Sequence, residues 1–238
     1  MKLLSTANPK IQKGSKLGYL SFILHLAPAD LSGKEVCPKR TAGCTAACLN
    51  TAGRGGMFKK GENTNVIQKA RIRKTKEFFA NRTDFLIQLT ADIKLAIKQA
   101  AKAGLTPVVR LNGTSDIAWE KYEVAYGRNI FQLFPYIQFY DYTKVLGRKV
   151  KDIPNYHLTF SAADGNDADV AEAIKQGYNI AMVFDHLPAT YMGLPVINAD
   201  DTDLRFLDPK GVIAGLKAKG RAKKDVSGFV RKVIPIAA

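Results

Sequence analysis

The sequence predicts an α/β fold: a partial or complete (β/α) barrel of parallel strands with outer helices. Apolar runs of β type recur along the chain, and most are separated by segments able to form at least a turn of helix. The runs are nearly continuous in apolar residues, which is typical of strands buried on both faces of a parallel sheet. Six or more such units in about 220 residues, with no GxGxxG after the first strand, favour a barrel over a dinucleotide-binding sheet.

The elements at the beginning of the chain follow from local patterns. The first strand is the run LGYLSFILHLAP, which starts at Leu17 and is stopped by Pro28. The cysteine loop, residues 37–56, follows this strand directly. The segment 61–79 predicts a half-solvated helix with Asn63 or Thr64 as its N-cap. The segment 81–104 predicts a longer amphipathic helix that ends at a glycine.

The rest of the chain alternates between strand and helix patterns. The segment DADVAEAIKQG is the clearest of the intervening helices, and LPVINAD and GVIAGLKAKG add two further candidate strands. The main apolar runs of this part are TPVVRLNG (106–113), YIQFYDYT (136–143), YHLTFSAA (156–163) and YNIAMVFDH (178–186).

The length of 238 residues predicts one barrel-like domain over residues 1–238, with a basic C-terminal segment at 216–238. Thirty-six Lys and Arg against 21 Asp and Glu give a net charge of +15, which favours nucleic acid, nucleotides or acidic surfaces as partners. No apolar run reaches the roughly 18–20 residues of a membrane span, and the N-terminal segment lacks the apolar region of a secretory signal. We therefore expect a cytoplasmic protein that does not contact a membrane.

Polar side chains follow the predicted strands, at the edge where the active site of a parallel α/β fold lies. Each of them is also a common turn or helix-cap residue, so their convergence at several strand ends is what favours a site. Lys144 is suited to neutralising an anionic substrate. The candidate catalytic residues are Asp116, Asp141, Lys144 and Asp185, and the candidate cofactor-binding residues at the strand ends are Asn112, Ser115 and Ser161.

All three cysteines lie in the loop after the first strand, at Cys37, Cys44 and Cys48. An odd cluster of thiols in a cytosolic protein indicates metal or thiol chemistry rather than disulfides. Cys44 and Cys48 share one face if TAACL begins a helix. Three soft sulfur ligands suit an iron-sulfur cluster that leaves one iron open to a small molecule. The alternatives are a zinc site completed by an aspartate or His25, and simple burial or thiol reactivity.

The stretch GRGG, residues 53–56, follows the third cysteine. Its glycines let backbone N–H groups approach an anion such as a carboxylate or a phosphate. Arg54 and Gly55 are therefore candidate cofactor-binding residues, although the same stretch also suits a simple turn.

The motifs CP-x5-C-x3-CL followed by GR, then RLNGTSDIAWE, FYDYTK and LPVINADDTDLRFLDPK, resemble the bacteriophage family called gene product 88 across most of the chain. The cysteine loop is also similar to that of radical S-adenosylmethionine enzymes, in which three cysteines hold a [4Fe-4S] cluster at the mouth of a partial barrel. This second resemblance implies Cys37, Cys44 and Cys48 as metal ligands and S-adenosylmethionine as a cofactor. The usual spacing in those enzymes is C-x3-C-x2-C, and both gaps are longer here.

Three functions follow as hypotheses. The first is a radical-SAM-like iron-sulfur enzyme of phage type acting on a nucleotide, nucleic acid or other anionic substrate. The second is a non-redox [4Fe-4S] enzyme that binds its substrate at the open iron. The third is a metal-stabilised nucleic-acid-binding protein without catalysis. The aspartates at the strand ends favour an enzyme, because an electrostatic binding face should not concentrate carboxylates at the same rim.

Overall fold

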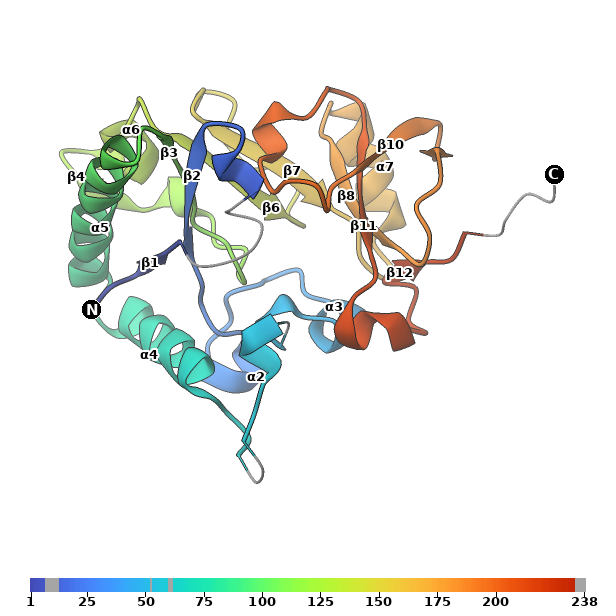
Figure 1. The fold of residues 1–238 in the computed structure, drawn as a ribbon, viewed down its shortest axis with the longest axis horizontal. Coiled ribbons are helices and arrows are strands. Elements are labelled where there is room, and N and C mark those ends of the chain that lie inside the picture. The colour runs from blue at the N-terminus through green and yellow to red at the C-terminus, as the bar shows by residue number, and fades with distance from the viewer. Residues whose placement is uncertain (7–12, 52, 60–61, 234–238) are drawn as a thin grey trace. The chain divides into compact units, whose positions relative to one another are not determined.

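The computed structural model describes residues 1–6, 13–51, 53–59 and 62–233. The fold is mixed α/β, and its main sheet has ten strands that are mainly parallel (Figure 1). The strand order is β1-β2-β3-β6-β7-β8-β11-β10-β9, with β12 paired to β8. The predicted parallel sheet with helices is therefore confirmed. A complete barrel, one of the two forms predicted, is not shown, because the order of the described strands has two separate ends, β1 and β9; the partial barrel stays a prediction.

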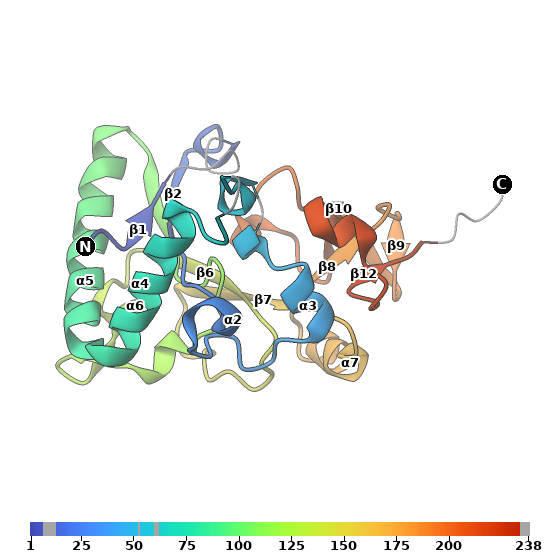
Figure 2. The ribbon, with the colours of Figure 1, turned by 90° about the horizontal axis from the view of Figure 1, so that it is seen from below.

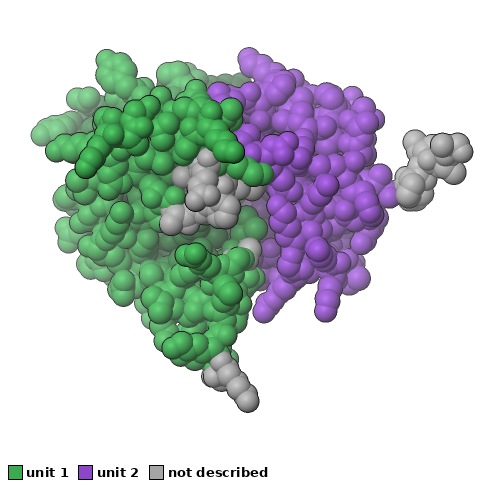
Figure 3. Space-filling view, viewed as in Figure 1, with its two compact units in different colours: residues 1–38, 49–141, 147–157 green, residues 39–48, 142–146, 158–238 purple. Residues whose placement is uncertain are grey.

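The chain divides into two compact units, which Figure 3 shows in different colours. Each unit is assembled from several chain segments, so each is described by itself below. The single domain predicted over 1–238 stays a prediction. Unit 1 comprises residues 1–38, 49–141 and 147–157, and unit 2 comprises residues 39–48, 142–146 and 158–238.

The strands of unit 1 are the first part of the sheet. β1 (Leu4–Ser5) pairs antiparallel with β2 (Tyr19–Leu24), which runs parallel to β3 (Thr106–Arg110). β3 in turn runs parallel to the first residues of β6 (Gln138–Thr143). The last four residues of β2 and the last three of β3 are buried, as the apolar runs predict.

Two long helices cover unit 1, and Figure 2 shows them beside each other. α4 (Val66–Ala80) begins after Asn65, whose side chain accepts a hydrogen bond from the backbone N–H of Gln68 at 2.9 Å. The N-cap is therefore one or two residues later than predicted. α5 (Arg82–Lys102) has the expected apolar face, and it packs against β3. Buried Asp92 on that helix accepts hydrogen bonds from the backbone N–H groups of Leu3 and Leu4, at the start of β1.

Shorter elements complete unit 1. They are α2 (Ala29–Ser32), the 3₁₀ turns η1 (Leu49–Thr51), η2 (Gly53–Gly56) and η3 (Trp119–Lys121), the hairpin of β4 (Glu123–Ala125) with β5 (Arg128–Asn129), and α6 (Ile130–Leu133).

The strands of unit 2 are the second part of the sheet. β7 (Tyr156–Ser161), β8 (Ile180–Phe184), β11 (Ile213–Lys217) and β10 (Leu194–Asn198) run parallel, and β12 (Val230–Arg231) also pairs parallel with β8. β9 (Thr190–Tyr191) is antiparallel to β10. The basic C-terminal segment thus contributes a short strand, while residues 234–238 lie outside the described residues.

The helices of unit 2 are shorter than those of unit 1. α7 (Asp167–Lys175) buries Val170 and Ala173 against an apolar core that includes Phe160, Ile180 and Phe184. The remaining helical elements are α3 (Ala42–Ala46), η4 (Arg205–Leu207) and η5 (Gly220–Lys224). No helix in the described part of the chain is both long enough and apolar enough to cross a membrane.

Candidate functional site

Four of the predicted site residues meet in unit 1, at the C-terminal ends of β3 and β6. Asn112 donates its backbone N–H to the Asp141 carboxylate at 2.7 Å, and the Ser115 hydroxyl donates to the Asn112 side-chain oxygen at 2.8 Å. Asp116 follows in the same loop. All four residues are buried, and Asp141 is only 1% exposed. These predicted site residues therefore do lie together at strand ends, but the group that they form is buried inside unit 1.

Three residues that the sequence analysis did not single out complete this buried group. Arg148 forms two hydrogen bonds of 2.6 Å to the carboxylate of Glu120, and its guanidinium is 3.4 Å from Asp116. Tyr156 donates its hydroxyl to Asp141 at 3.0 Å. We call these seven residues the buried polar network: Asn112, Ser115, Asp116, Glu120, Asp141, Arg148 and Tyr156. Arg148 lies in a basic loop that carries no sequence signal of burial, whereas Tyr156 begins the predicted apolar run 156–163.

The buried network has a pH-dependent member. Burial raises the pKa of the Asp141 carboxyl to about 7, although Arg110 and the hydrogen bond from Asn112 oppose the shift. A raised folded-state pKa means that the folded protein binds more protons than the unfolded chain between about pH 4 and pH 7, so stability falls as the pH rises through this window.

Urea unfolding between pH 4.5 and 8 tests this expectation, with Asp141→Asn as the comparison. As the pH rises, the unfolding free energy of the wild type should fall by a few kcal/mol relative to that of Asp141→Asn. Identical pH profiles for the two proteins would show that Asp141 does not carry this titration. The exposed carboxylate variant Glu123→Gln serves as the control and should leave the profile unchanged.

The cysteine segment of unit 2 is held against the loop that follows β7. Asp164 accepts the backbone N–H of Gly43 at 3.0 Å and of Cys44 at 3.2 Å, and it also accepts the hydroxyl of Thr41. Partial burial would raise the pKa of Asp164, but these donors outweigh it and hold the pKa below its ordinary value. Asp164 is therefore ionised at neutral pH and fixes the start of α3.

Gly43 is needed for this close approach. A Cβ atom at this position would lie 2.0 Å from the Ser227 hydroxyl oxygen and 2.7 Å from Asp164. Cys44 and Cys48 are four residues apart, and the backbone turn continues past α3 through a hydrogen bond from Cys48 N–H to the Thr45 carbonyl. TAACL does not begin a helix, because α3 starts at Ala42 and ends at Ala46; both cysteines are half-buried, and their sharing of one face stays a prediction.

Cys37 belongs to unit 1, and the residue before it, Val36, is hydrogen-bonded to the loop that follows β3. The Val36 carbonyl accepts the backbone N–H of Asp116 at 2.7 Å. The backbone N–H of Cys37 donates to the Glu35 carboxylate at 2.8 Å. In each unit, then, the cysteine segment is hydrogen-bonded to the residues that follow a parallel strand.

The chemistry of the three thiols fits a soft metal group. All three cysteines are partly exposed and none forms a disulfide, and sulfur is a soft ligand that suits iron. Among the described residues, the structure has no group of three or more His, Cys, Asp or Glu side chains placed to hold a metal ion. The ligand role of Cys37, Cys44 and Cys48 therefore stays a prediction that rests on the donor set.

Arg54 and Gly55 lie in η2, and this turn is packed by side chains from α4. Asn65 donates to the carbonyls of both residues, at 3.0 and 3.1 Å, and Gln68 donates to the Gly55 carbonyl at 3.0 Å. A Cβ atom at Gly55 would lie 2.6 Å from the Asn50 carbonyl oxygen. The glycine is thus required by a close backbone approach, and its role toward a cofactor stays a prediction.

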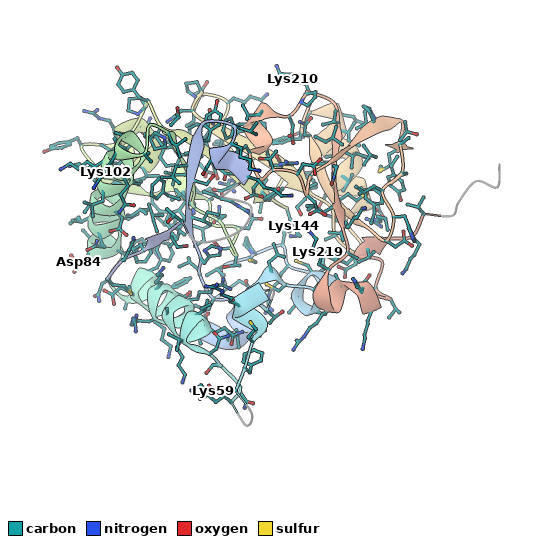
Figure 4. All side chains as sticks on the ribbon, in the orientation of Figure 1. Lys59, Asp84, Lys102, Lys144, Lys210 and Lys219 are labelled. Carbon is teal, nitrogen blue, oxygen red and sulfur yellow. The ribbon has the colours of Figure 1, made fainter. Side chains whose placement is uncertain are left out.

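The remaining predicted site residues belong to unit 2. Ser161 ends β7, and half-buried Lys144, which Figure 4 labels, follows β6. Asp185 follows β8 and accepts the backbone N–H groups of Val233 at 3.0 Å and His186 at 2.8 Å. These bonds hold the pKa of Asp185 below its ordinary value. Ser161 and Asp185 therefore both lie at the C-terminal ends of parallel strands of this unit.

Taken together, the fold and these strand-end residues define a mixed α/β protein with a mainly parallel sheet and a three-cysteine segment that is hydrogen-bonded to loops after strands. The family model described as "Gene product 88" matches residues 2–233, and the chain belongs to that family. The resemblance to this family is thereby confirmed. Neither the curated proteins nor the solved structures contain a match to the chain.

Proposed function

We propose that the protein is an iron-sulfur enzyme that acts on an anionic substrate, with Cys37, Cys44 and Cys48 as the ligands of a [4Fe-4S] cluster. One observation carries this proposal. The cysteine segment is hydrogen-bonded to the residues after β3 in unit 1, through Val36, and to the residues after β7 in unit 2, through Gly43 and Cys44. Strand C-terminal ends are where parallel α/β enzymes place their reacting groups.

A cluster with three protein ligands leaves one iron open to a small molecule such as S-adenosylmethionine. The chain's own residues would support that group in separate ways. Asp164 is a positioning residue, because it uses its carboxylate to hold the backbone of Cys44. Lys144 and Asp185, which follow β6 and β8, offer one cation and one carboxylate for orienting a substrate. Asp116 and Asp141 are less suited to contact substrate, since both are buried in the network.

Anaerobic reconstitution of the full chain with iron and sulfide tests the proposal. We expect about four iron atoms and four sulfides per chain in the wild type, and a reduced-cluster electron paramagnetic resonance spectrum that changes when S-adenosylmethionine is added. Each of the variants Cys37→Ala, Cys44→Ala and Cys48→Ala should lose most of this iron. Thr45→Ala is the matched control, because it changes the same turn and keeps all three thiols.

The outcomes separate the hypotheses. A cluster whose spectrum ignores S-adenosylmethionine favours the non-redox enzyme, in which the open iron takes the substrate itself. Colourless, zinc-loaded protein favours the metal-stabilised binding protein. Folded wild type that holds no more iron and sulfide than Cys44→Ala would overturn the proposal.

A further inference from the structure

We infer that the outward face of α4 is a docking surface for the phosphate backbone of nucleic acid. We define this basic face by Lys69, Arg73 and Lys76, which are all exposed. Their spacing of four and then three residues places them on one side of the helix. Figure 2 shows α4 on the side of unit 1 that is turned toward the viewer.

The basic face carries charge that the protein does not neutralise. α4 contains five Lys or Arg residues and one Glu over 15 residues, whereas α5 contains four cations and two Asp over 21 residues. In the described part of the chain, no carboxylate forms an ion pair with Lys69, Arg73 or Lys76. The one acidic residue of α4, Glu77, accepts a hydrogen bond from Asn81 at 3.0 Å.

The positive charges on α4 act on one another. Burial lowers the pKa of Lys74, on the adjoining side of the helix, to about 8; Asp92 opposes this shift, and Arg71 and Arg73 add to it. Cations that repel each other in this way are stabilised when a polyanion binds beside them. An anionic partner bound beside this helix would offset the repulsion.

The dimensions of the basic face suit a nucleic acid strand. Lys69 and Lys76 are seven residues apart, which is about 10 Å along a helix with a rise of about 1.5 Å per residue. That length matches about three nucleotides at a rise of about 3.4 Å per strand residue. Three cations in one row can therefore each contact a different phosphate.

A membrane surface is a poorer partner for this helix. A helix that binds the bilayer interface needs a free apolar face, but the large apolar side chain Phe78 of α4 is buried within unit 1. The most exposed apolar residue of α4, Val66, lies one turn before Lys69 on the same side, but one valine does not make an apolar face. This helix can then bind a partner only through its positive charge, and nucleic acid carries a denser line of negative charge than a membrane surface.

This inference deepens the proposed function. It rests on that proposal in one respect, the expectation that the substrate is an anion. Fluorescence anisotropy with labelled single-stranded and duplex DNA of about 20 nucleotides, at a series of NaCl concentrations, measures the binding. The triple variant Lys69→Gln/Arg73→Gln/Lys76→Gln should weaken binding at least about tenfold and reduce the slope of log Kd against log [NaCl] by about 2 to 3.

α5 provides a matched control. Lys94, Lys98 and Lys102 are exposed and equally spaced along it, and Figure 4 labels Lys102 near its end and Lys59 in the loop before α4. Lys94→Gln/Lys98→Gln/Lys102→Gln removes the same charge and should change the affinity less than about threefold. Equal weakening by both triple variants would overturn the inference, because net charge alone would then explain the binding.

Further outcomes are equally decisive. Wild type that does not bind either DNA at low salt would overturn the inference, as would α4-dependent binding to phosphatidylserine vesicles without DNA binding. The same titration with Cys44→Ala separates the two proposals. DNA binding that persists in Cys44→Ala, or in wild type that takes up no iron, supports the basic face even if the cluster proposal fails.

Discussion

Replacing Arg148 with alanine is expected to destabilise the protein by about 3–5 kcal/mol, since removing one partner of a buried ion pair leaves an uncompensated charge. The side chains of Arg148 and Glu120 are 2% and 4% exposed, and two hydrogen bonds of 2.6 Å join them. The substitution also removes the cation that lies 3.4 Å from Asp116. Equilibrium unfolding in urea, followed by circular dichroism, measures the loss.

Two comparison variants identify the cause. Arg128→Ala removes an exposed arginine of the same unit and should change stability by less than about 0.5 kcal/mol. Glu120→Gln introduced into the Arg148→Ala protein should recover part of the loss, because it removes the stranded carboxylate. If the double variant is as unstable as the sum of its single variants, lost packing rather than unpaired charge is the explanation.

Trp119→Ala is the second substitution with a large expected effect. It should destabilise the protein by about 3–5 kcal/mol, because it leaves a cavity among aromatic rings. The side chain is fully buried, and its ring centroid is 5.2 Å from that of Phe78 and 6.5 Å from that of Phe85. Its indole N–H donates to Asn112 at 3.0 Å, so the same substitution also loosens the buried polar network.

Trp119→Phe and Tyr136→Ala complete this experiment. Trp119→Phe keeps most of the apolar contacts and should lose less than Trp119→Ala. Tyr136 is 97% exposed, so Tyr136→Ala should leave the unfolding midpoint almost unchanged. A loss for Trp119→Ala as small as that for Tyr136→Ala would show that the aromatic cluster does not support unit 1.

Much of the fold could be predicted, because its strands are apolar runs with turn residues at both ends. The predicted segments contain β2, β3, β6, β7, β8, β10 and β11, as well as α5 and α7, and α4 ends one residue beyond its predicted segment. The order of the strands could not be predicted, since it depends on pairings between residues far apart in the chain. β11, for example, lies between β8 and β10, and only packing decides that position.

The candidate site was predicted in part. The pattern TAACL indicated helical structure near Cys44, but the helix begins at Ala42 and ends at Ala46, before Cys48. The strand-end rule brought Asn112 and Asp141 together, but it did not distinguish a buried network from an open site. That distinction depends on Arg148, whose burial is determined by carboxylates about 30 residues earlier in the chain.

The alternation of the two units along the chain limits how the protein can be dissected. The polypeptide passes from one unit to the other after residues 38, 48, 141, 146 and 157. No single truncation can therefore release either unit whole, and a fragment ending between residues 49 and 157 would lack most strands of unit 2 while keeping its cysteine turn. Deletion mapping of activity is thus expected to give insoluble or misfolded fragments, and point substitutions are the appropriate tool for this family.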